Sequence, residues 1–354
     1  MTNRMVTVAR RVVAVTGASA GVGRAIVRAF AADGADVGLI ARNREALEAA
    51  RREVEAQGGR AVVCVTDVAD PQQVAAAAAT IEQALGPIEV WVNNAMVTVV
   101  SPVSRLAPEE VRRVTEVSYL GAVYGTMAAL ERMRTRNRGI IIQIGSALAY
   151  RAIPLQAPYC GAKFALRGFT DALRTELLHE GSHVRLTMLQ LPAVNTPQFD
   201  WCRTHMPRVP RPVSPVFQPE LVAQCALWAS RRSRREVRIG WPALKAIWGN
   251  KVLPALADWY LARTAYDAQM AETAVSAQRP DNLWHAPAGD AGAHGRFDAE
   301  ARSGSVQVWL DRHRLGIGIA VLGVLAAMAV RRLKDARDST GSDCAGTDCN
   351  RRYH

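Results

Sequence analysis

The sequence predicts an α/β fold, a doubly wound parallel sheet in one catalytic domain, followed by a helical C-terminal extension. Short β-branched runs alternate with helical patterns over the first two-thirds of the chain, as in strand–helix–strand units. Residues 139–145 are almost entirely apolar, which is typical of a parallel strand whose sheet is covered by helices on both faces. A glycine-rich stretch also joins the first strand to the first helix.

The composition is that of a basic globular protein. Apolar residues make up 49% of the 354 residues and charged residues 21%, so the chain can bury a full core. The net charge of +12 by itself suggests contact with polyanions. However, the arginines are scattered, and there is no zinc-ligand spacing and no basic helix with a reading face. We therefore expect no nucleic-acid partner and no metal site in the body of the protein.

The cysteines and the N-terminus indicate a reduced, cytoplasmic-side setting. Residues 1–11 are polar and basic and lead directly into a strand, unlike a secretory signal. Four widely spaced cysteines are expected to be buried thiols rather than disulfide partners: Cys64, Cys160, Cys202 and Cys225. Cys344 and Cys349 lie in a polar tail, where they either stay free, close a small loop or bind a metal.

The glycine-rich loop is the first candidate binding site. The β-branched run 11–16 ends at this loop, and residues 24–32 read as a helix. The glycines permit a tight turn, the approach of backbone N–H groups to a pyrophosphate, and close packing of helix on strand. The positive end of the helix dipole favours phosphate at the same place. The residues expected to hold a dinucleotide here are Gly17, Ser19, Gly21, Val22 and Gly23.

The glycine spacing resembles that of the short-chain dehydrogenase/reductase family. Thr16 followed by Gly-x-x-x-Gly-x-Gly is the pattern that opens the Rossmann-like fold in that family. The resemblance covers roughly the first two-thirds of the chain and ends near Gly240. It implies an oxidoreductase that uses NAD(P) and assembles into dimers or tetramers.

The end of the second strand indicates which dinucleotide is bound. In NAD-binding proteins an acidic residue about 20 positions beyond the glycine loop contacts the ribose 2′-hydroxyl. Ala41 stands at that place, and Arg42 follows as a cation that can clamp a 2′-phosphate, with Ser19 as a second donor. We therefore expect NADP(H). The alternative is that Arg42 and Arg44 belong to a solvated helix N-terminus, where positive charge is unfavourable.

Two further strand ends match the family pattern. The third strand is followed by Asp67 and Val68, which the resemblance implies border the adenine; alternatively, Asp67 only caps a turn. The fourth strand is followed by Asn93 and Ala95, which the resemblance implies form part of the cofactor floor. Met96 replaces the usual glycine after them and is expected to reshape the loop beside the nicotinamide.

Ser146, Tyr159 and Lys163 form the candidate catalytic group. Tyr159 and Lys163, in a Tyr-x-x-x-Lys pattern, share one face of a predicted helix. An ammonium beside a phenol moves the tyrosine pKa from about 10 towards the working pH, which suits a general acid/base for a carbonyl or hydroxyl group. The resemblance implies that the Ser146 hydroxyl supports the developing charge on the substrate oxygen. The alternatives are an ordinary amphipathic helix and a serine that only forms a turn.

Two other candidate residues follow from the resemblance. Ser118, in a helix predicted over 108–134, stands where the family commonly carries an asparagine that holds a proton-relay water. A hydroxyl can still contact water, so Ser118 remains a catalytic candidate. Thr196 ends a turn that resembles the family's Pro-Gly-x-x-Thr pattern and would bind the nicotinamide carboxamide. The Pro-rich, aromatic stretch 199–219 then reads either as a lid for a bulky apolar substrate or as a rigid surface loop.

The C-terminal third lies outside the resemblance. Residues 242–279 are predicted to be helical, and the Gly-, His- and Asp-rich stretch 282–298 reads as an irregular, partly ordered linker. Residues 315–330 carry no charge and are flanked by arginines. As a helix they span ~24 Å, less than a ~30 Å hydrocarbon core, although flanking arginines can snorkel. A C-terminal transmembrane anchor is favoured over an in-plane or partner-binding helix and over a core helix.

Together these patterns predict an NADP(H)-dependent oxidoreductase that interconverts a carbonyl and a secondary alcohol on a hydrophobic substrate. Tyr159 would exchange the proton, Lys163 would lower its pKa and hold the ribose, and Ser146 would polarise the oxygen. The alternative is a membrane-associated NADP-binding protein with little or no catalytic activity, which Ser118, Met96 and the long extension favour. The expected domains are a catalytic domain (1–245), a helical extension and linker (246–300), an apolar helix (301–333) and a disordered tail (334–354).

Overall fold

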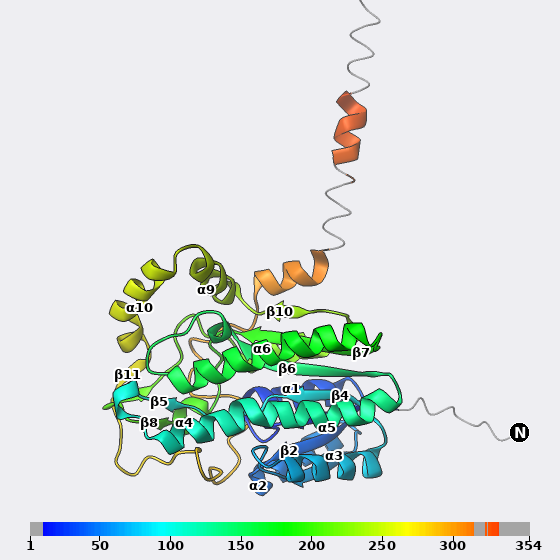
Figure 1. Ribbon diagram of the computed structural model, residues 1–354, viewed down its shortest axis with the longest axis horizontal. Helices are drawn as coiled ribbons and strands as arrows, with labels where there is room; N and C mark the ends of the chain where they lie inside the picture. The colour runs from blue at the N-terminus through cyan, green and yellow to red at the C-terminus, as the bar shows by residue number, and fades with distance from the viewer. Residues whose placement is uncertain (1–9, 315–322, 324, 333–354) are drawn as a thin grey trace, which may run out of the picture. The chain divides into compact units, whose positions relative to one another are not determined.

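A seven-stranded parallel sheet forms the centre of the protein (Figure 1). The computed structural model describes residues 10–314, 323 and 325–332. The strand order is β10-β7-β6-β4-β1-β2-β3, which is a doubly wound topology as predicted. The strands are β1 (Val12–Thr16), β2 (Asp36–Ala41), β3 (Ala61–Val65), β4 (Ile88–Asn93), β6 (Gly139–Ser146), β7 (Val184–Leu191) and β10 (Glu236–Arg238).

Helices cover both faces of this sheet (Figure 1). On one face α1 (Gly21–Ala32) packs against α2 (Arg44–Ala56) and α8 (Pro219–Arg231). The helices of the other face are α3 (Pro71–Leu85), α4 (Pro108–Thr115), α5 (Gly121–Thr135) and α6 (Ala157–His179). β2 and β3 lie on one side of β1, whereas β4 and the later strands lie on the other side, so the strand order reverses between β1 and β4. In open α/β sheets, ligands bind beyond the carboxyl ends of the strands at such a point.

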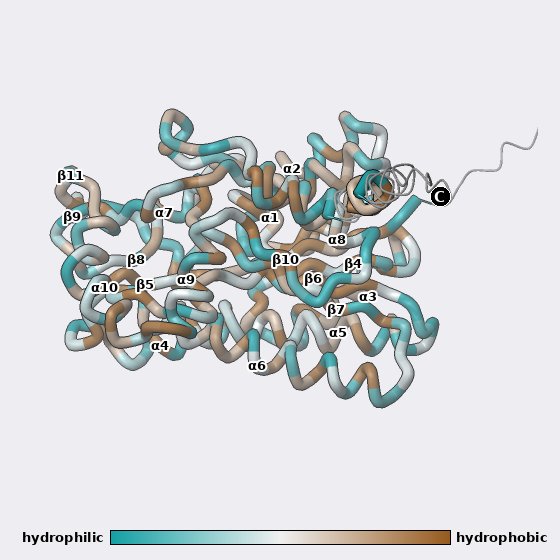
Figure 2. The backbone as a smooth tube through the Cα atoms, turned by 90° about the horizontal axis from the view of Figure 1, so that it is seen from above, coloured by the Kyte–Doolittle hydropathy of each residue, from teal (hydrophilic) through white to brown (hydrophobic). Residues whose placement is uncertain are grey.

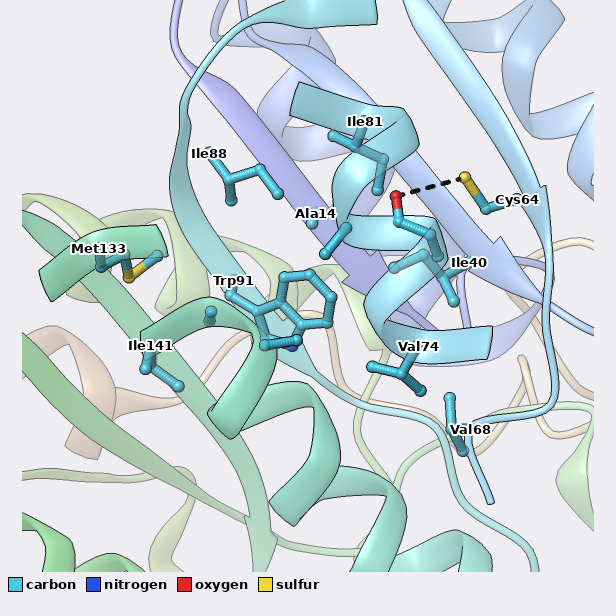
Figure 3. Close-up of a cluster of buried hydrophobic side chains, with 14 of the residues drawn as sticks. Ala14, Ile40, Cys64, Val68, Val74, Ile81, Ile88, Trp91, Met133 and Ile141 are labelled. Carbon is cyan, nitrogen blue, oxygen red and sulfur yellow. Dashed lines mark hydrogen bonds between the residues drawn. The ribbon is translucent and has the colours of Figure 1, made fainter. Parts of the chain in front are cut away.

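The apolar core lies between the sheet and α3 and α5 (Figure 3). Trp91 and Ile141 on neighbouring strands are fully buried and pack with Val74 and Ile81 from α3 and Met133 from α5. Burying an aliphatic side chain of this size contributes about 1.5–3 kcal/mol. Figure 2 shows the same segregation, with hydrophobic segments gathered in the middle of the sheet and hydrophilic segments in the surrounding loops. The four cysteines of the described part of the chain are buried and form no disulfide, which confirms that prediction.

The helix predicted over 108–134 contains a π-helical turn. Between α4 and α5 the chain adopts η2 (Glu116–Leu120), in which the hydrogen bonds span one residue more than in an α-helix. Ser118 lies in this turn and is only 1% exposed. A π turn rotates the residues that follow it relative to a regular helix, so the sequence period alone could not show which way Ser118 faces.

Two small sheets in the proline-rich region were not predicted. In one, β5 (Val99–Val100) pairs with β8 (Arg203–Thr204), and in the other β9 (Arg208–Pro210) pairs with β11 (Met270–Ala274). Both sheets anchor the stretch that the sequence marked as a long loop, which also contains α7 (Gln198–Trp201). Strands this short have no recognisable alternation, and their partners are distant in sequence. Two 3-10 turns complete the compact unit, η1 (Val103–Arg105) and η3 (Ala147–Ala149).

The extension is helical at first, as predicted, and forms α9 (Trp241–Val252) and α10 (Pro254–Ala268). The described residues up to Ser305 belong to one compact unit, and the described residues from Val306 onwards belong to a second. The linker expected over 282–298 is instead part of the first unit and is ordered by many hydrogen bonds, as shown below. No helix among the described residues is long and apolar enough to cross a membrane, so the expected anchor gains no support. Residues 315–322 and 324 of that segment lie outside the described residues, as do Cys344 and Cys349.

Candidate active site

The glycine-rich loop forms a cradle of backbone at the carboxyl end of β1. Gly17 and Gly21 have positive φ angles of 68° and 58°, which other residues rarely adopt. A Cβ atom on Gly23 would lie 2.0 Å from the carbonyl oxygen of Gly17, so only glycine lets α1 begin this close to the strand. The cradle therefore has the geometry that close approach of a dinucleotide pyrophosphate requires.

Asn94 holds this cradle in place, a role that the sequence did not reveal. Its Nδ2 donates to the carbonyl oxygens of Thr16 at 3.0 Å and Gly17 at 3.3 Å. The backbone N–H groups of Asn94 and Ala95 both donate to the Thr16 hydroxyl, at 2.9 and 3.1 Å. Thr16 and Asn94 thus tie the loop after β1 to the end of β4. Their presence within the family-like motifs was the only sequence signal for this contact.

Two predicted site residues face the protein interior instead of the cavity. Asn93 is 2% exposed, accepts a hydrogen bond from Trp91 Nε1 at 2.8 Å and donates to Thr126 Oγ1 at 3.0 Å. The Ser118 hydroxyl donates to Val97 O at 2.8 Å and accepts from Val97 N–H at 3.0 Å. Neither side chain is among the residues that line the cavity. Both side chains instead satisfy buried polar groups.

The three residues of the candidate catalytic group meet at the carboxyl end of β6 and line one cavity. Ser146 ends the strand, and Tyr159 and Lys163 lie in the first turns of α6. The Ser146 side chain is hydrogen-bonded to Tyr159 and accepts from the N–H of Leu148 at 3.1 Å. Lys163 Nζ donates to Ile144 O at 2.7 Å and lies 5.5 Å from the centroid of the Tyr159 ring. A phenol, a hydroxyl and an ammonium therefore converge where a substrate oxygen can bind.

The start of α6 is fixed by an unusual backbone conformation. Leu155, two residues before the helix begins, has a positive φ of 68°, which is costly for a residue with a side chain. Its side chain is 3% exposed, and its carbonyl oxygen accepts from Ser101 N–H at 2.9 Å. Such strain persists only where the surroundings determine the conformation. Leu155 therefore helps to set the position of Tyr159.

Burial determines the protonation states of the Tyr159–Lys163 pair. Burial raises the pKa of Tyr159 above its ordinary value, and the hydrogen bond with Ser146 opposes this only in part. Burial also lowers the pKa of Lys163 to about 8. The expectation that Lys163 brings the Tyr159 pKa down is therefore not met in this structure. At neutral pH Tyr159 carries its proton and is able to donate it to a carbonyl oxygen.

Arg42 lines the cavity, but its guanidinium also binds the C-terminal extension. Nη2 donates to Asn282 O at 2.6 Å. Nη1 donates to Trp284 O at 3.0 Å and to Leu283 O at 3.4 Å. The sequence did not predict these partners, because residues 282–298 have the composition of a linker.

Asp67, after β3, caps a turn and also lies in the cavity wall. Asp67 caps a turn by accepting from Ala69 N–H at 3.0 Å, and it forms an ion pair with Arg113. Asp67 and Val68 both line the cavity as well. The turn-capping role therefore does not exclude a place beside the cofactor.

The turn after β7 is also anchored by the extension. Asn195 is fully buried, and its N–H donates to Phe217 O at 2.8 Å. Its side-chain amide donates to Asp298 Oδ1 at 2.8 Å and accepts from Phe297 N–H at 3.0 Å. The next residue, Thr196, lines the cavity. Asn195 is thus a positioning residue for Thr196 that sequence reasoning missed.

The cavity has a volume of about 850 Å³, near the upper end of the range of ligand pockets. The predicted site residues that line it are Gly17, Ser19, Gly21, Val22, Arg42, Asp67, Val68, Ala95, Ser146, Tyr159, Lys163 and Thr196. Apolar side chains from short strands, helices and loops around the carboxyl edge of the sheet also line it: Val100, Leu148, Ile153, Leu191, Phe199, Trp201, Val213, Leu261 and Met270. The glycine cradle and the catalytic group therefore open into one largely apolar space.

Sequence comparison relates this chain to known oxidoreductases. Residues 11–206 match the model of the family described as short chain dehydrogenase. The chain is 30% identical over 328 residues to the uncharacterized oxidoreductase YxnA of Bacillus subtilis (strain 168). This similarity covers 92% of the present chain and 91% of the Bacillus protein, so it includes the extension.

Solved structures with the same fold bind nicotinamide dinucleotides. The alcohol dehydrogenase of the archaeon Thermococcus sibiricus, solved with 5-hydroxy-NADP, matches with a TM-score of 0.56 and 26% identity. A short chain dehydrogenase of Mycobacterium paratuberculosis, bound to NAD, matches with a TM-score of 0.58 and 25% identity. Each match covers 65% of the present chain and 96% of the other. One neighbour holds an NADP analogue and the other NAD, so the neighbours do not decide the cofactor preference.

Proposed function

We propose that this protein interconverts a carbonyl and a secondary alcohol on a hydrophobic substrate with NADP(H). The chain belongs to the short-chain dehydrogenase family and is an NAD(P)-dependent dehydrogenase/reductase. The observation that carries this proposal is the convergence of Ser146, Tyr159 and Lys163 on one cavity with the glycine cradle. The alternative of a protein without catalytic activity rested on Ser118, Met96 and the long extension, and the structure weakens the first of these. That side chain binds Val97 and does not line the cavity.

The geometry supports a division of labour during carbonyl reduction. When bound, NADPH supplies the hydride that the carbonyl carbon accepts. Tyr159, protonated at neutral pH, donates its proton to the carbonyl oxygen, while the Ser146 hydroxyl donates a hydrogen bond to the same oxygen. Lys163 then stabilises the phenolate left on Tyr159 by its positive charge. In alcohol oxidation Tyr159 takes the proton back.

Two observations support NADP(H) over NAD(H). Ala41 at the end of β2 provides no carboxylate to bind a ribose 2′-hydroxyl or repel a 2′-phosphate. Arg42, the next residue, lines the cavity and carries a guanidinium suited to phosphate. The glycine cradle lies in the same cavity at the start of α1, where backbone N–H groups and the helix dipole favour a pyrophosphate.

The cavity wall supports a hydrophobic substrate. Phe199 and Val213 from the proline-rich stretch, and Leu261 from α10, contribute apolar surface around a few polar groups. Sites of this kind bind apolar molecules and orient them by the few hydrogen bonds available. The strand pairings β5–β8 and β9–β11 hold the proline-rich stretch against this wall.

The test is oxidation of NADPH by the full-length protein in the presence of hydrophobic aldehydes, ketones and steroids, with small polar carbonyls as the control panel. We expect turnover of hydrophobic members and little turnover of the polar panel, with NADPH preferred to NADH. Binding of NADPH, measured separately by fluorescence, distinguishes two failures. Binding without turnover of any carbonyl would support the non-catalytic alternative, and absence of binding would contradict the cofactor assignment.

A further inference from the structure

Residues 282–298, called the strap from here on, cross the dinucleotide cradle. In Figure 1 the strap is part of the yellow-to-orange segment that follows β11 without helix or strand. Five of its residues line the cavity: Asn282, Ala286, Pro287, Gly289 and Ala291. The strap is therefore one wall of the site in which we propose that NADP(H) binds.

Strap carbonyl oxygens accept hydrogen bonds from the same protein groups that would donate to the cofactor phosphates. The N–H of Gly21, in the pyrophosphate cradle, donates to Gly292 O at 2.9 Å. Arg42, the proposed 2′-phosphate ligand, donates to three strap carbonyls, of which Asn282 O is nearest at 2.6 Å. A carbonyl oxygen accepts the same hydrogen bonds as a phosphate oxygen, without its charge. With the strap in this position, a phosphate at Gly21 must first displace Gly292 O.

An ion pair fastens the strap to α1. The Asp290 carboxylate binds Arg24 through two contacts, Nη1 to Oδ1 at 3.1 Å and Nη2 to Oδ2 at 3.2 Å. Arg24 is only 1% exposed and is held from the other side by Glu53 at 2.8 and 3.0 Å. Because Arg24 is fixed by Glu53, the Asp290 side is the one that can open. A two-contact guanidinium–carboxylate pair gives both energy and a defined geometry.

The far end of the strap packs tightly beside the nicotinamide-binding turn. A Cβ atom on Gly295 would lie 2.4 Å from the carbonyl oxygen of Thr196. Asp298 accepts a hydrogen bond from Asn195, which precedes Thr196. Between this contact and the Asp290 ion pair the strap has no helix or strand to stiffen it. A segment that is held by separate polar contacts, and not by the packing of a helix or strand, opens locally at lower cost than a packed helix.

We propose that the strap is a binding element of the dinucleotide site, which opens to admit NADP(H) and closes over it in a shifted position that leaves Gly21 and Arg42 to the phosphates, with the Asp290–Arg24 ion pair setting the rate of opening. This inference rests on the proposed function. It assigns a role to residues that lie outside the catalytic core and explains why the extension contacts both ends of the cavity. Opening must break the ion pair, the strap contacts at Gly21 and Arg42, and the hydrogen bonds that Asn43 donates to Pro287 O and Gly289 O and that Arg113 donates to Leu283 O.

The first experiment measures the rates of NADPH binding and release by stopped-flow fluorescence. Asp290→Asn keeps the size of the side chain and removes its charge, so it should weaken the ion pair and leave α1 intact. We expect both the association and the dissociation rate constants to rise about tenfold. This factor corresponds to a loss of ~1.4 kcal/mol in the free energy that favours the closed strap over the open one. Glu180→Gln is the matched control, because it neutralises a surface ion pair with Arg134 away from the strap.

The second experiment uses a matched pair of glycines. Gly295→Ala should push the strap away from Thr196, whereas Gly304→Ala meets no atom within 4 Å. We expect faster hydrogen–deuterium exchange across the strap in Gly295→Ala only, and slower exchange in the wild-type strap after NADPH is added. This readout does not depend on catalytic activity.

The outcomes separate the two proposals. If NADPH binds but the rates in Asp290→Asn stay within about twofold of wild type and NADPH leaves strap exchange unchanged, the strap is a static wall and the inference is wrong. If NADPH does not bind to the wild-type protein, the proposed function fails and the inference fails with it. Faster rates in Asp290→Asn with unchanged rates in Glu180→Gln would support the strap as the gate.

Discussion

The ammonium of Lys163 lies 5.5 Å from the centroid of the Tyr159 ring, one helical turn further along α6. At an effective dielectric constant of about 20, unit charges at such a distance interact by about 3 kcal/mol, or about two pKa units. In the structure burial raises the Tyr159 pKa, and only the hydrogen bond with Ser146 lowers it. The charge of Lys163 therefore matters most when Tyr159 gives up its proton during turnover.

Replacing Tyr159 should remove the proton donor and leave the cofactor site intact. We expect Tyr159→Phe to bind NADPH with an affinity close to wild type and to lose about 10²–10⁴ in kcat for carbonyl reduction. Steady-state kinetics and fluorescence titration measure the two quantities. Tyr266→Phe, an exposed tyrosine outside the cavity, is the control. Turnover retained in Tyr159→Phe would contradict the assignment of the acid.

The pH dependence of carbonyl reduction should reflect Lys163. Its folded-state pKa is about 8, so its positive charge is present below pH 8 and is lost above it. Without that charge the phenolate of Tyr159 is less stable, and Tyr159 becomes a weaker acid. We expect kcat/KM for reduction to fall as the pH rises through about 8. A profile that stays flat up to pH 10 would show that this charge does not assist proton transfer.

Lys163 should also reduce the stability of the protein below its own pKa. Burial depresses its pKa from 10.5 to about 8, so the unfolded state binds more protons between these values and stability rises with pH there. Below pH 8 the penalty for the buried charge is fully present. We expect Lys163→Met to be more stable than wild type by about 1–2 kcal/mol at pH 7, since the relief of charge burial exceeds the lost hydrogen bond.

Denaturant unfolding at several pH values measures this difference. The advantage of Lys163→Met should shrink as the pH is raised from 7 to 10, because wild-type Lys163 then becomes neutral. An advantage that stays constant over this range would indicate that packing, and not charge, is responsible.

Arg42 should determine the preference between the two cofactors. Loss of a charge-assisted hydrogen bond costs about 1.5–3 kcal/mol, so Arg42→Gln should weaken NADPH binding about 10-fold to 100-fold and change NADH binding little. Dissociation constants for both cofactors provide the measurement. Arg44→Gln, in which an exposed arginine outside the cavity is neutralised, should leave both unchanged. Equal losses for NADPH and NADH in Arg42→Gln would argue against a 2′-phosphate contact.

Ser118 should contribute to stability and not to turnover. Its hydroxyl bonds both polar groups of the Val97 backbone, so Ser118→Ala leaves a buried N–H and a buried carbonyl without this partner. We expect a loss of about 1–3 kcal/mol in the free energy of unfolding, with kcat of the folded enzyme within about threefold of wild type. A large fall in kcat with unchanged stability would instead restore the relay role that the sequence suggested.

Local sequence patterns predicted the sheet and the catalytic group well. β-branched and apolar runs defined the seven central strands, and parallel connectivity brings their carboxyl ends to one edge. Ser146 ends one of these strands, and the four-residue spacing places Tyr159 and Lys163 on one side of α6. These residues meet because strand ends and helix faces are both set by short-range periodicity.

Side-chain direction at irregular positions was less predictable. The family-like motif predicted that Asn93 belongs to the cofactor floor. Its side chain instead points into the core, where Trp91 and Thr126 form hydrogen bonds with its amide. Ser118 lies in a π turn, whose extra residue changes the face that the side chain presents. In both cases a neighbour distant in sequence decides the orientation.

By itself the sequence determined the doubly wound sheet, the glycine cradle and the spacing of the catalytic residues, because each depends on residues a few positions apart. Only the tertiary structure decided that residues 282–298 form a wall of the site. Their contacts join backbone carbonyls to donors such as Arg42, which is 241 residues away from Leu283 along the chain. Backbone carbonyls are the same in every residue type, so a segment that binds through them carries no periodic or compositional signal of what it binds.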